Sequence, residues 1–192
     1  MKKSLGFLSL AAAAVFAAPA HAQLPNVTPF SFEVRGGLAA PLGDFGETTG
    51  PFGDVKSGTT LGANVTLHFM PLLGLYGGYS YNSFSVANND NNLVDQGVEA
   101  GLRLAIPTPL IPIDPYVKGG AVYHRIGQEN ASDSDNSLGL EVGAGIGIGL
   151  GPKLSFTPQV TYTSYEPKYD EQADVDFKIQ HIRVDVGLRI RL

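Results

Sequence analysis

Apolar and polar residues alternate with a period of two along most of the chain after residue 29. The clearest run is 182–192, where isoleucine, valine and leucine alternate with arginine, aspartate and glycine. A second run, 138–150, alternates leucine, valine, alanine and isoleucine with glycine and glutamate. A helix would spread the polar residues of such a run over all of its faces, whereas a strand keeps them on one face. The pattern therefore predicts β-strands.

Eight strands are predicted, and their connections alternate between long and short. The strands cover 30–35, 61–69, 73–82, 94–106, 116–124, 138–150, 154–163 and 182–192. Long polar connections at 43–58, 83–92, 126–137 and 165–176 alternate with shorter ones at 70–72, 107–115 and 151–153. Outer-membrane barrels have this parity, because short turns face one side of the membrane and longer loops face the other. We therefore predict an all-β fold, an eight-stranded antiparallel up-and-down transmembrane β-barrel.

The N-terminus has the pattern of a secretory signal peptide. Two lysines precede the apolar, alanine-rich run 5–18, and Ala20-His21-Ala22 provides a cleavage site between small residues. We expect residues 1–22 to be removed as the signal peptide. Residues 23–28 then form a short periplasmic lead, and residues 29–192 form the barrel in the bacterial outer membrane.

The distribution of charge indicates which face of the strands meets lipid. The alternation alone also fits a soluble barrel with an apolar interior. Here, however, the polar face carries acidic and basic residues at mid-strand, and enclosed charges of opposite sign can pair. An apolar exterior over 182–192 would be about 25 Å tall at a strand tilt of about 40°, which matches the apolar band of a membrane barrel. We expect a structural charge network in the lumen, formed by Glu33, Arg35, Asp95, Glu99, Arg103, Lys118, Glu141, Arg183, Asp185 and Arg189.

Composition and net charge exclude several classes of protein. Cysteine is absent, so the chain has neither disulfides nor thiolate chemistry. Removal of the signal peptide leaves 11 basic residues against 18 acidic ones, a balance that disfavours nucleic-acid binding. The four long connections together hold twelve acidic residues and two lysines. We therefore expect acidic external loops.

The histidines, serines and loop carboxylates match no catalytic or metal-binding pattern. His68 and His124 fall on the predicted inward face, where a histidine within a polar network needs no catalytic role. His124 with Ser132 or Ser134 is a poor match to the site of a lipid-modifying hydrolase. The run 133–136 lacks the third ligand and the turn glycine of a calcium loop. We predict no catalytic residue, no metal and no cofactor.

These features together resemble the small eight-stranded outer-membrane barrels of the OmpA/OmpX type, a porin-like family. The signal peptide, the glycine-rich strand 138–150, the Pro-Tyr-Val-Lys-Gly-Gly segment 115–120 and the last alternating strand carry the resemblance. It implies insertion by the barrel-assembly machinery and contact with outer-membrane lipids and lipopolysaccharide. Leu192 stands where the family usually ends in phenylalanine. Because the predicted barrel takes up residues 29–192, we expect no cell-wall-binding domain of the OmpA kind, and the resemblance does not imply wall anchoring.

Function is predicted as structural or surface-interactive, with a lumen closed by charged side chains. Eight strands leave an interior that side chains can fill, which argues against a wide pore. A narrow porin-like channel for ions or small solutes is the alternative, favoured by the glycine-lined strand 138–150. A soluble periplasmic ligand-binding barrel is the third interpretation, and an enzyme is the fourth.

Overall fold

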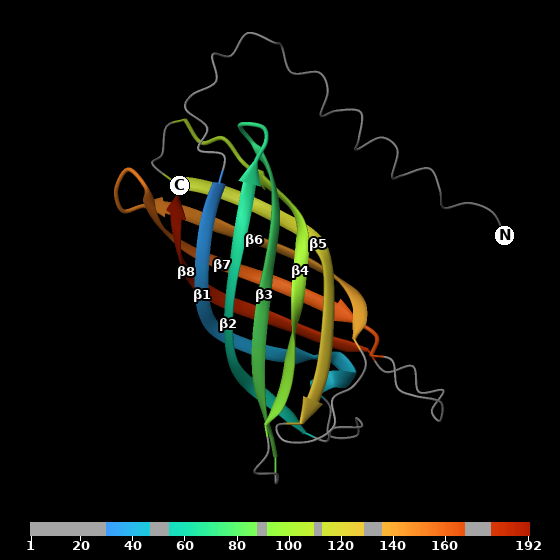
Figure 1. The fold of residues 1–192 in the computed structure, drawn as a ribbon. Coiled ribbons are helices and arrows are strands. Elements are labelled where there is room, and N and C mark those ends of the chain that lie inside the picture. The colour runs from blue at the N-terminus through green and yellow to red at the C-terminus, as the bar shows by residue number, and fades with distance from the viewer. Residues whose placement is uncertain (1–29, 47–53, 88–91, 110–112, 129–135, 168–177) are drawn as a thin grey trace, which may run out of the picture.

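A computed structural model shows a closed antiparallel barrel of eight strands (Figure 1). It describes residues 30–46, 54–87, 92–109, 113–128, 136–167 and 178–192. The strands are β1 (Phe30–Leu42), β2 (Val55–His68), β3 (Leu73–Val86), β4 (Leu93–Ala105), β5 (Ile113–Gln128), β6 (Ser137–Gly149), β7 (Leu154–Tyr165) and β8 (Ile179–Arg191). Each strand pairs with the next, and β8 closes the barrel on β1. The predicted fold class is confirmed.

The two ends of the barrel differ in the connections that they carry. We call the end with the connections after β1, β3, β5 and β7 the loop end, and the opposite end the turn end. Residues 30 and 192 both lie at the turn end, which is uppermost in Figure 1. A short 3₁₀ helix, η2 (Gly43–Gly46), follows β1 at the loop end. Across the described ranges, no helix has the length and apolar character needed to cross a bilayer.

Along most of each strand the apolar side chains point outward and the polar ones inward. On β8 the exposed fractions of Val184 and Val186 are 55% and 52%, whereas those of Arg183 and Asp185 are 0% and 1%. The same alternation on β5 turns Val117 outward and its neighbours Tyr116 and Lys118 inward. The exterior is therefore suited to hydrocarbon, as in a membrane barrel and unlike a soluble one.

Near the loop end this polarity is reversed. The interior there contains a hydrophobic cluster, which we call the loop-end apolar cluster; it consists of Ala39, Phe45, Val55, Phe84, Leu93, Val122, Ile126, Tyr165 and Ile179. The outward positions at the same end are mostly polar and include Thr59, Ser83, Ser85, Gln96, Arg125, Ser164 and Gln180. On β1 and β6 the outward residues stay apolar, as at Leu42 and Leu138. Most of this section therefore has the polarity of a soluble barrel.

Outward tyrosines lie close to the level at which the exterior polarity changes. They are Tyr79 and Tyr81 on β3, Tyr123 on β5 and Tyr162 on β7. Tyr81 is two residues before the outward Ser83, and Tyr162 is two residues before the outward Ser164. Tyrosine favours the membrane–water interface, because its ring is apolar and its hydroxyl polar. The tyrosines therefore mark the interface on the loop side.

Several strands are longer than predicted because they continue into the loop-end section. β1 extends to Leu42, β2 begins at Val55 and β3 ends at Val86, so the predicted connections 43–58 and 83–92 are too long. β5 runs from Ile113 to Gln128; at the turn end it begins within the predicted connection 107–115, and at the loop end it takes residues from the predicted connection 126–137. The interior becomes apolar there, so the outward-apolar pattern used to find the strands no longer applies.

A pair of inward glycines makes room for a tyrosine inside the barrel. Gly101 on β4 pairs with Gly120 on β5. A Cβ atom on Gly120 would lie 2.2 Å from the carbonyl oxygen of Ala100 and 2.7 Å from the hydroxyl of Tyr76. Only glycine permits this approach, since real Cβ atoms do not come so close to a backbone oxygen. Tyr76 can therefore lie across the interior and contact the charged residues described next.

Candidate functional site

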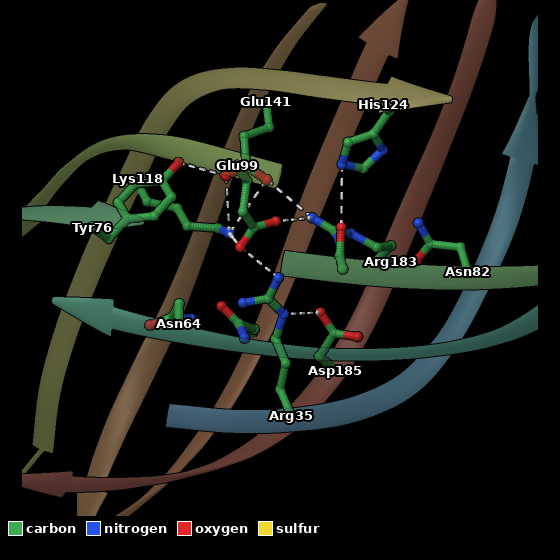
Figure 2. Close-up of polar contacts among 12 residues, drawn as sticks. Arg35, Asn64, Tyr76, Asn82, Glu99, Lys118, His124, Glu141, Arg183 and Asp185 are labelled. Atoms are coloured by element: carbon green, nitrogen blue, oxygen red, sulfur yellow. Dashed lines mark hydrogen bonds and ion pairs between the residues drawn. The ribbon is translucent and has the colours of Figure 1, made fainter. Parts of the chain in front are cut away.

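Six charged residues meet in the middle of the barrel, and we call them the central cluster. They are Arg35 on β1, Glu99 on β4, Lys118 on β5, Glu141 on β6, and Arg183 and Asp185 on β8. Figure 2 shows Arg35 and Arg183 both directed toward Glu99. Three acidic and three basic residues converge from five strands, so their formal charges balance.

Distances within the central cluster show direct pairing across the lumen. Arg35 donates from Nη2 to Oε1 of Glu99 at 2.5 Å. Arg183 donates from Nη2 to Oε2 of Glu141 at 2.9 Å and to Oε2 of Glu99 at 3.3 Å. The Tyr76 hydroxyl donates to Oε1 of Glu141 at 2.5 Å. Charge-assisted hydrogen bonds of this kind fix side-chain geometry and compensate for burial of the ions.

A second group, the turn-end cluster, lies between the central cluster and the turn end. Arg189 donates to Glu33, and Nη1 of Arg103 lies 4.0 Å from Oε2 of Glu33. The guanidinium carbon of Arg103 stands 3.5 Å from the centre of the Tyr116 ring, and that of Arg189 stands 5.2 Å from it. Gln159 also donates to Glu33, at 3.2 Å. Tyr116 thus makes cation–π contacts with two arginines that share one carboxylate.

A third group surrounds Asp95, directly beneath the loop-end apolar cluster. Asp95 accepts hydrogen bonds from the Tyr165 hydroxyl at 2.7 Å and from Nδ2 of Asn82 at 3.0 Å. Nδ1 of His124 lies 3.0 Å from Oδ1 of Asp95, and Nε2 of His181 lies 3.7 Å from Oδ2. Phe84, a member of the apolar cluster, packs edge-on against the His181 ring, with the two ring centres 5.7 Å apart. The apolar cluster therefore covers this Asp95 cluster from the loop side.

The Asp95 cluster contains a serine, a histidine and an aspartate in hydrogen-bonding order. The Ser80 hydroxyl lies 3.3 Å from Nε2 of His124, whose Nδ1 faces Asp95. This is the order of a hydrolase triad, but function also requires a substrate position next to the serine and donors for the oxyanion. Ser80, His124 and Asp95 are all fully buried beneath the apolar cluster. The geometry is that of a buried hydrogen-bond network.

The structure places all ten of the predicted network residues inside the barrel and divides them among these three groups. Sequence reasoning missed the neutral residues that complete each group. They are Asn64, whose amide donates to Glu33 at 3.4 Å, and Tyr76, Ser80, Asn82, Tyr116, Gln159, Tyr165 and His181. Their only signal is an inward position in the alternation. Ser132, Ser134 and the acidic run 133–136 are not all described: Asn136 alone lies within the described ranges. Among the described residues, no group of three or more His, Asp and Glu side chains has the arrangement of a metal site.

Little open space remains between the central and turn-end clusters. The cavity between them has a volume of about 10 Å³. Its lining includes Glu33, Arg103 and Tyr116 from the turn-end cluster, and Tyr76 and Lys118 from the centre. A volume of roughly this size holds at most about one water molecule.

Comparisons with known proteins agree with the architecture. The model of the family described as "Outer membrane protein beta-barrel domain" matches residues 8–189. Among solved structures, Neisserial surface protein A is similar, with a TM-score of 0.68 and 15% identity over 85% of this chain and 97% of that one. The outer membrane protein OprG from Pseudomonas aeruginosa has a TM-score of 0.51 and 16% identity over 84% of this chain and 96% of that one.

A third similar structure is Ail, the attachment invasion locus protein of Yersinia pestis, solved with the heparin analogue sucrose octasulfate. Its TM-score is 0.50, with 15% identity over 84% of this chain and 99% of that one. At such identities, the likeness shows the fold alone. No curated protein sequence matches the chain. The family model covers most of the chain, and the chain therefore belongs to the outer-membrane β-barrel family of the bacterial outer membrane.

Proposed function

We propose that this protein has a structural or surface-interaction role in the outer membrane, with a lumen that is closed to solutes. The observation that carries the proposal is the packing of the central and turn-end clusters around a cavity of about 10 Å³. The loop-end apolar cluster adds a second, uncharged barrier in the same lumen. An ion moving through the barrel would have to break buried ion pairs and then cross an apolar section.

The test is the conductance of the refolded protein in a planar lipid bilayer. We expect no stable channel of nanosiemens size, because the side chains occupy the route. The variant Arg183→Gly removes the longest fully buried side chain of the central cluster, and it should produce small, frequent current steps if that cluster is the barrier. Arg191→Gly at the exposed turn end is the matched control and should stay silent. Large, stable currents from the unmodified protein would refute the proposal.

A narrow channel is the second candidate, favoured by buried polar atoms without partners. On β7 the hydroxyls of Thr157, Thr161 and Thr163 face inward and find no hydrogen-bond acceptor or donor among the described residues. They lie beside the inward glycine row of β6, since Thr161 pairs with Gly143. Buried polar groups in this position bind water. Arg183→Gln would then change a measurable current, and Arg191→Gln would leave it unaltered.

The loops supply the interaction role in this proposal. Their twelve acidic residues against two lysines favour a cationic partner, or lipopolysaccharide bridged by divalent cations. A sulfated polyanion, such as the heparin analogue bound to Ail, suits this charge poorly. Binding of a polycation and of heparin to intact cells, measured by pull-down, distinguishes a cationic partner from a sulfated polyanion. Preferential binding of heparin would contradict the assignment.

Export through a cleaved signal peptide and a non-enzymatic role complete the proposal. The mass of the purified protein tests cleavage after Ala22, a position outside the described residues. Insertion would require the barrel-assembly machinery, and the loop end would face the outside of the cell. Burial of Ser80 and His124 beneath the apolar cluster supports a role without catalysis. Labelling of Ser80 by a fluorophosphonate in the folded protein would contradict it.

A further inference from the structure

The outer surface of the barrel contains a groove where β6, β7 and β8 approach the loop end. We call it the loop-end groove, and its volume is about 690 Å³. The residues used below are Leu138, Leu140, Tyr162, Ser164, Lys178 and Gln180. The groove lies on the outward face, because Ser164 and Gln180 alternate with the buried Thr163, Tyr165 and Ile179.

The hollow arises from one small residue between larger ones. Strand pairing aligns Leu140, Ser164 and Gln180 in one row across three strands, with the serine in the middle. Leu138 and Leu140 stand out from the surface, each with an exposed fraction of 71%. The serine side chain therefore forms the floor of a recess, which the leucines border on one side and the glutamine on the other.

The recess crosses the level at which the exterior changes from apolar to polar. One row toward the turn end, the aligned residues are Val142, Tyr162 and Ile182, all suited to hydrocarbon or to its edge. On the loop side, the groove ends at the ion pair between Lys178 and Glu166, whose N–O distance is 3.5 Å. The two side chains are 47% and 70% exposed, so the pair is weak and a competing anion can displace the glutamate.

We propose that the loop-end groove binds one outer-leaflet lipid, a phosphorylated glycolipid of the lipid A class. Its acyl chain would lie against Leu140 and Tyr162, its sugar would meet the Ser164 hydroxyl and the Gln180 amide, and its phosphate would pair with Lys178. A molecule with an apolar chain and an anionic, hydroxyl-rich head complements both halves of the groove. This site relies on the proposed orientation of the loop end toward the outside, but it does not require a closed lumen.

The experiment measures lipid retained by the folded protein in phosphatidylcholine nanodiscs that contain a few mole per cent of bis-phosphorylated lipid A. Native mass spectrometry should detect one retained lipid A per barrel. Ser164→Leu fills the recess and Lys178→Glu reverses its charge, so each should weaken retention by on the order of tenfold. The matched controls Thr59→Leu and Lys56→Glu introduce the same two residues at the loop end of β2, outside the groove, and should retain lipid A like the unmodified protein.

Three results would overturn the site. Equal loss in the β2 controls would mean that lipid A binds the whole perimeter without a groove. Unchanged retention in both groove variants would mean that lipid A binds elsewhere. Equal retention of dephosphorylated lipid A or of phosphatidylglycerol would contradict the role of the phosphate or of the sugar. Electrophoretic migration before and after boiling shows that each variant is folded, and the conductance test of the lumen is a separate measurement.

Discussion

Arg183 and Glu141 meet across the barrel interior, with Nη2 of the arginine 2.9 Å from Oε2 of the glutamate. They come from β8 and β6, which are not neighbours, because β7 lies between them. Arg183 reaches Glu99 on β4 as well. The contact therefore connects strands that share no backbone hydrogen bonds, and it braces the cross-section of the barrel.

Replacement of Arg183 by methionine should destabilise the barrel by about 3–5 kcal/mol, because it leaves Glu99 and Glu141 buried with too few cations. The measurement is urea unfolding in phospholipid vesicles, followed by electrophoretic migration without boiling. Arg191→Met is the control, since its pair with Asp114 is exposed and should contribute less than about 1 kcal/mol. An equal loss of unfolding free energy in the two variants would show that the central cluster contributes no more to stability than an exposed ion pair.

Phe45 should contribute more to stability than its place in a connection suggests. It is 1% exposed in the loop-end apolar cluster and packs edge-on against Phe84, with ring centres 5.2 Å apart. Phe45→Ala leaves a cavity and should cost about 3 kcal/mol in the same urea assay. Phe69→Ala at the turn end removes a ring that is 49% exposed and leaves no enclosed cavity, so it should cost clearly less. An equal cost would mean that Phe45 is not packed as described.

Two glycine-to-alanine substitutions, one inside the barrel and one at its open turn end, should differ in their effect on stability. Gly120→Ala brings a methyl group against the backbone of β4 and the Tyr76 hydroxyl, so we expect a loss of about 1–3 kcal/mol. Gly149→Ala meets nothing within 4 Å and should be neutral or slightly stabilising, since alanine restricts the unfolded chain. Urea midpoints of the two variants give the comparison. A neutral Gly120→Ala would contradict the close approach of β4 and β5.

A lysine scan of outward positions should locate the membrane boundary. Val186→Lys lies in the middle of the apolar exterior of β8 and should cost about 2–4 kcal/mol, as expected near the bilayer midplane. Thr59→Lys lies at the polar loop end of β2 and should cost about 0–1 kcal/mol. The readout is the stability of each variant in vesicles. Equal costs would place the loop-end section inside the hydrocarbon, contrary to its polar exterior.

The sequence predicted the part of the barrel that faces lipid, but not its continuation beyond. Within 73–82 the apolar residues occupy odd positions, whereas from Ser83 to Val86 they occupy even ones. Both segments belong to β3, and the side chains keep their alternation between the two faces. The change of environment shifts the apolar positions by one residue, and a search for one continuous pattern ends the strand there. The predicted connection 83–92 therefore included strand residues.

The sequence could not predict which charged side chains pair within the lumen, and the reason is geometric. Arg183 pairs with Glu99 and Glu141, which are 84 and 42 residues away. Such contacts depend on the stagger between strands, and the alternation gives only the face of each residue. His124 illustrates the same point. Sequence proximity suggested Ser132 or Ser134, whereas strand pairing brings it to Ser80 and Asp95.

The reversal of polarity along the barrel has a consequence for the protein without lipid or detergent. Only the hydrocarbon-facing belt then meets an unsuitable solvent, because most of the loop-end section already presents hydroxyl and amide groups to water. Copies of the chain should associate side by side through that belt, while their loop-end sections remain in contact with water. Withdrawal of detergent should therefore yield small rosettes of folded barrels, visible by electron microscopy, in preference to an amorphous precipitate.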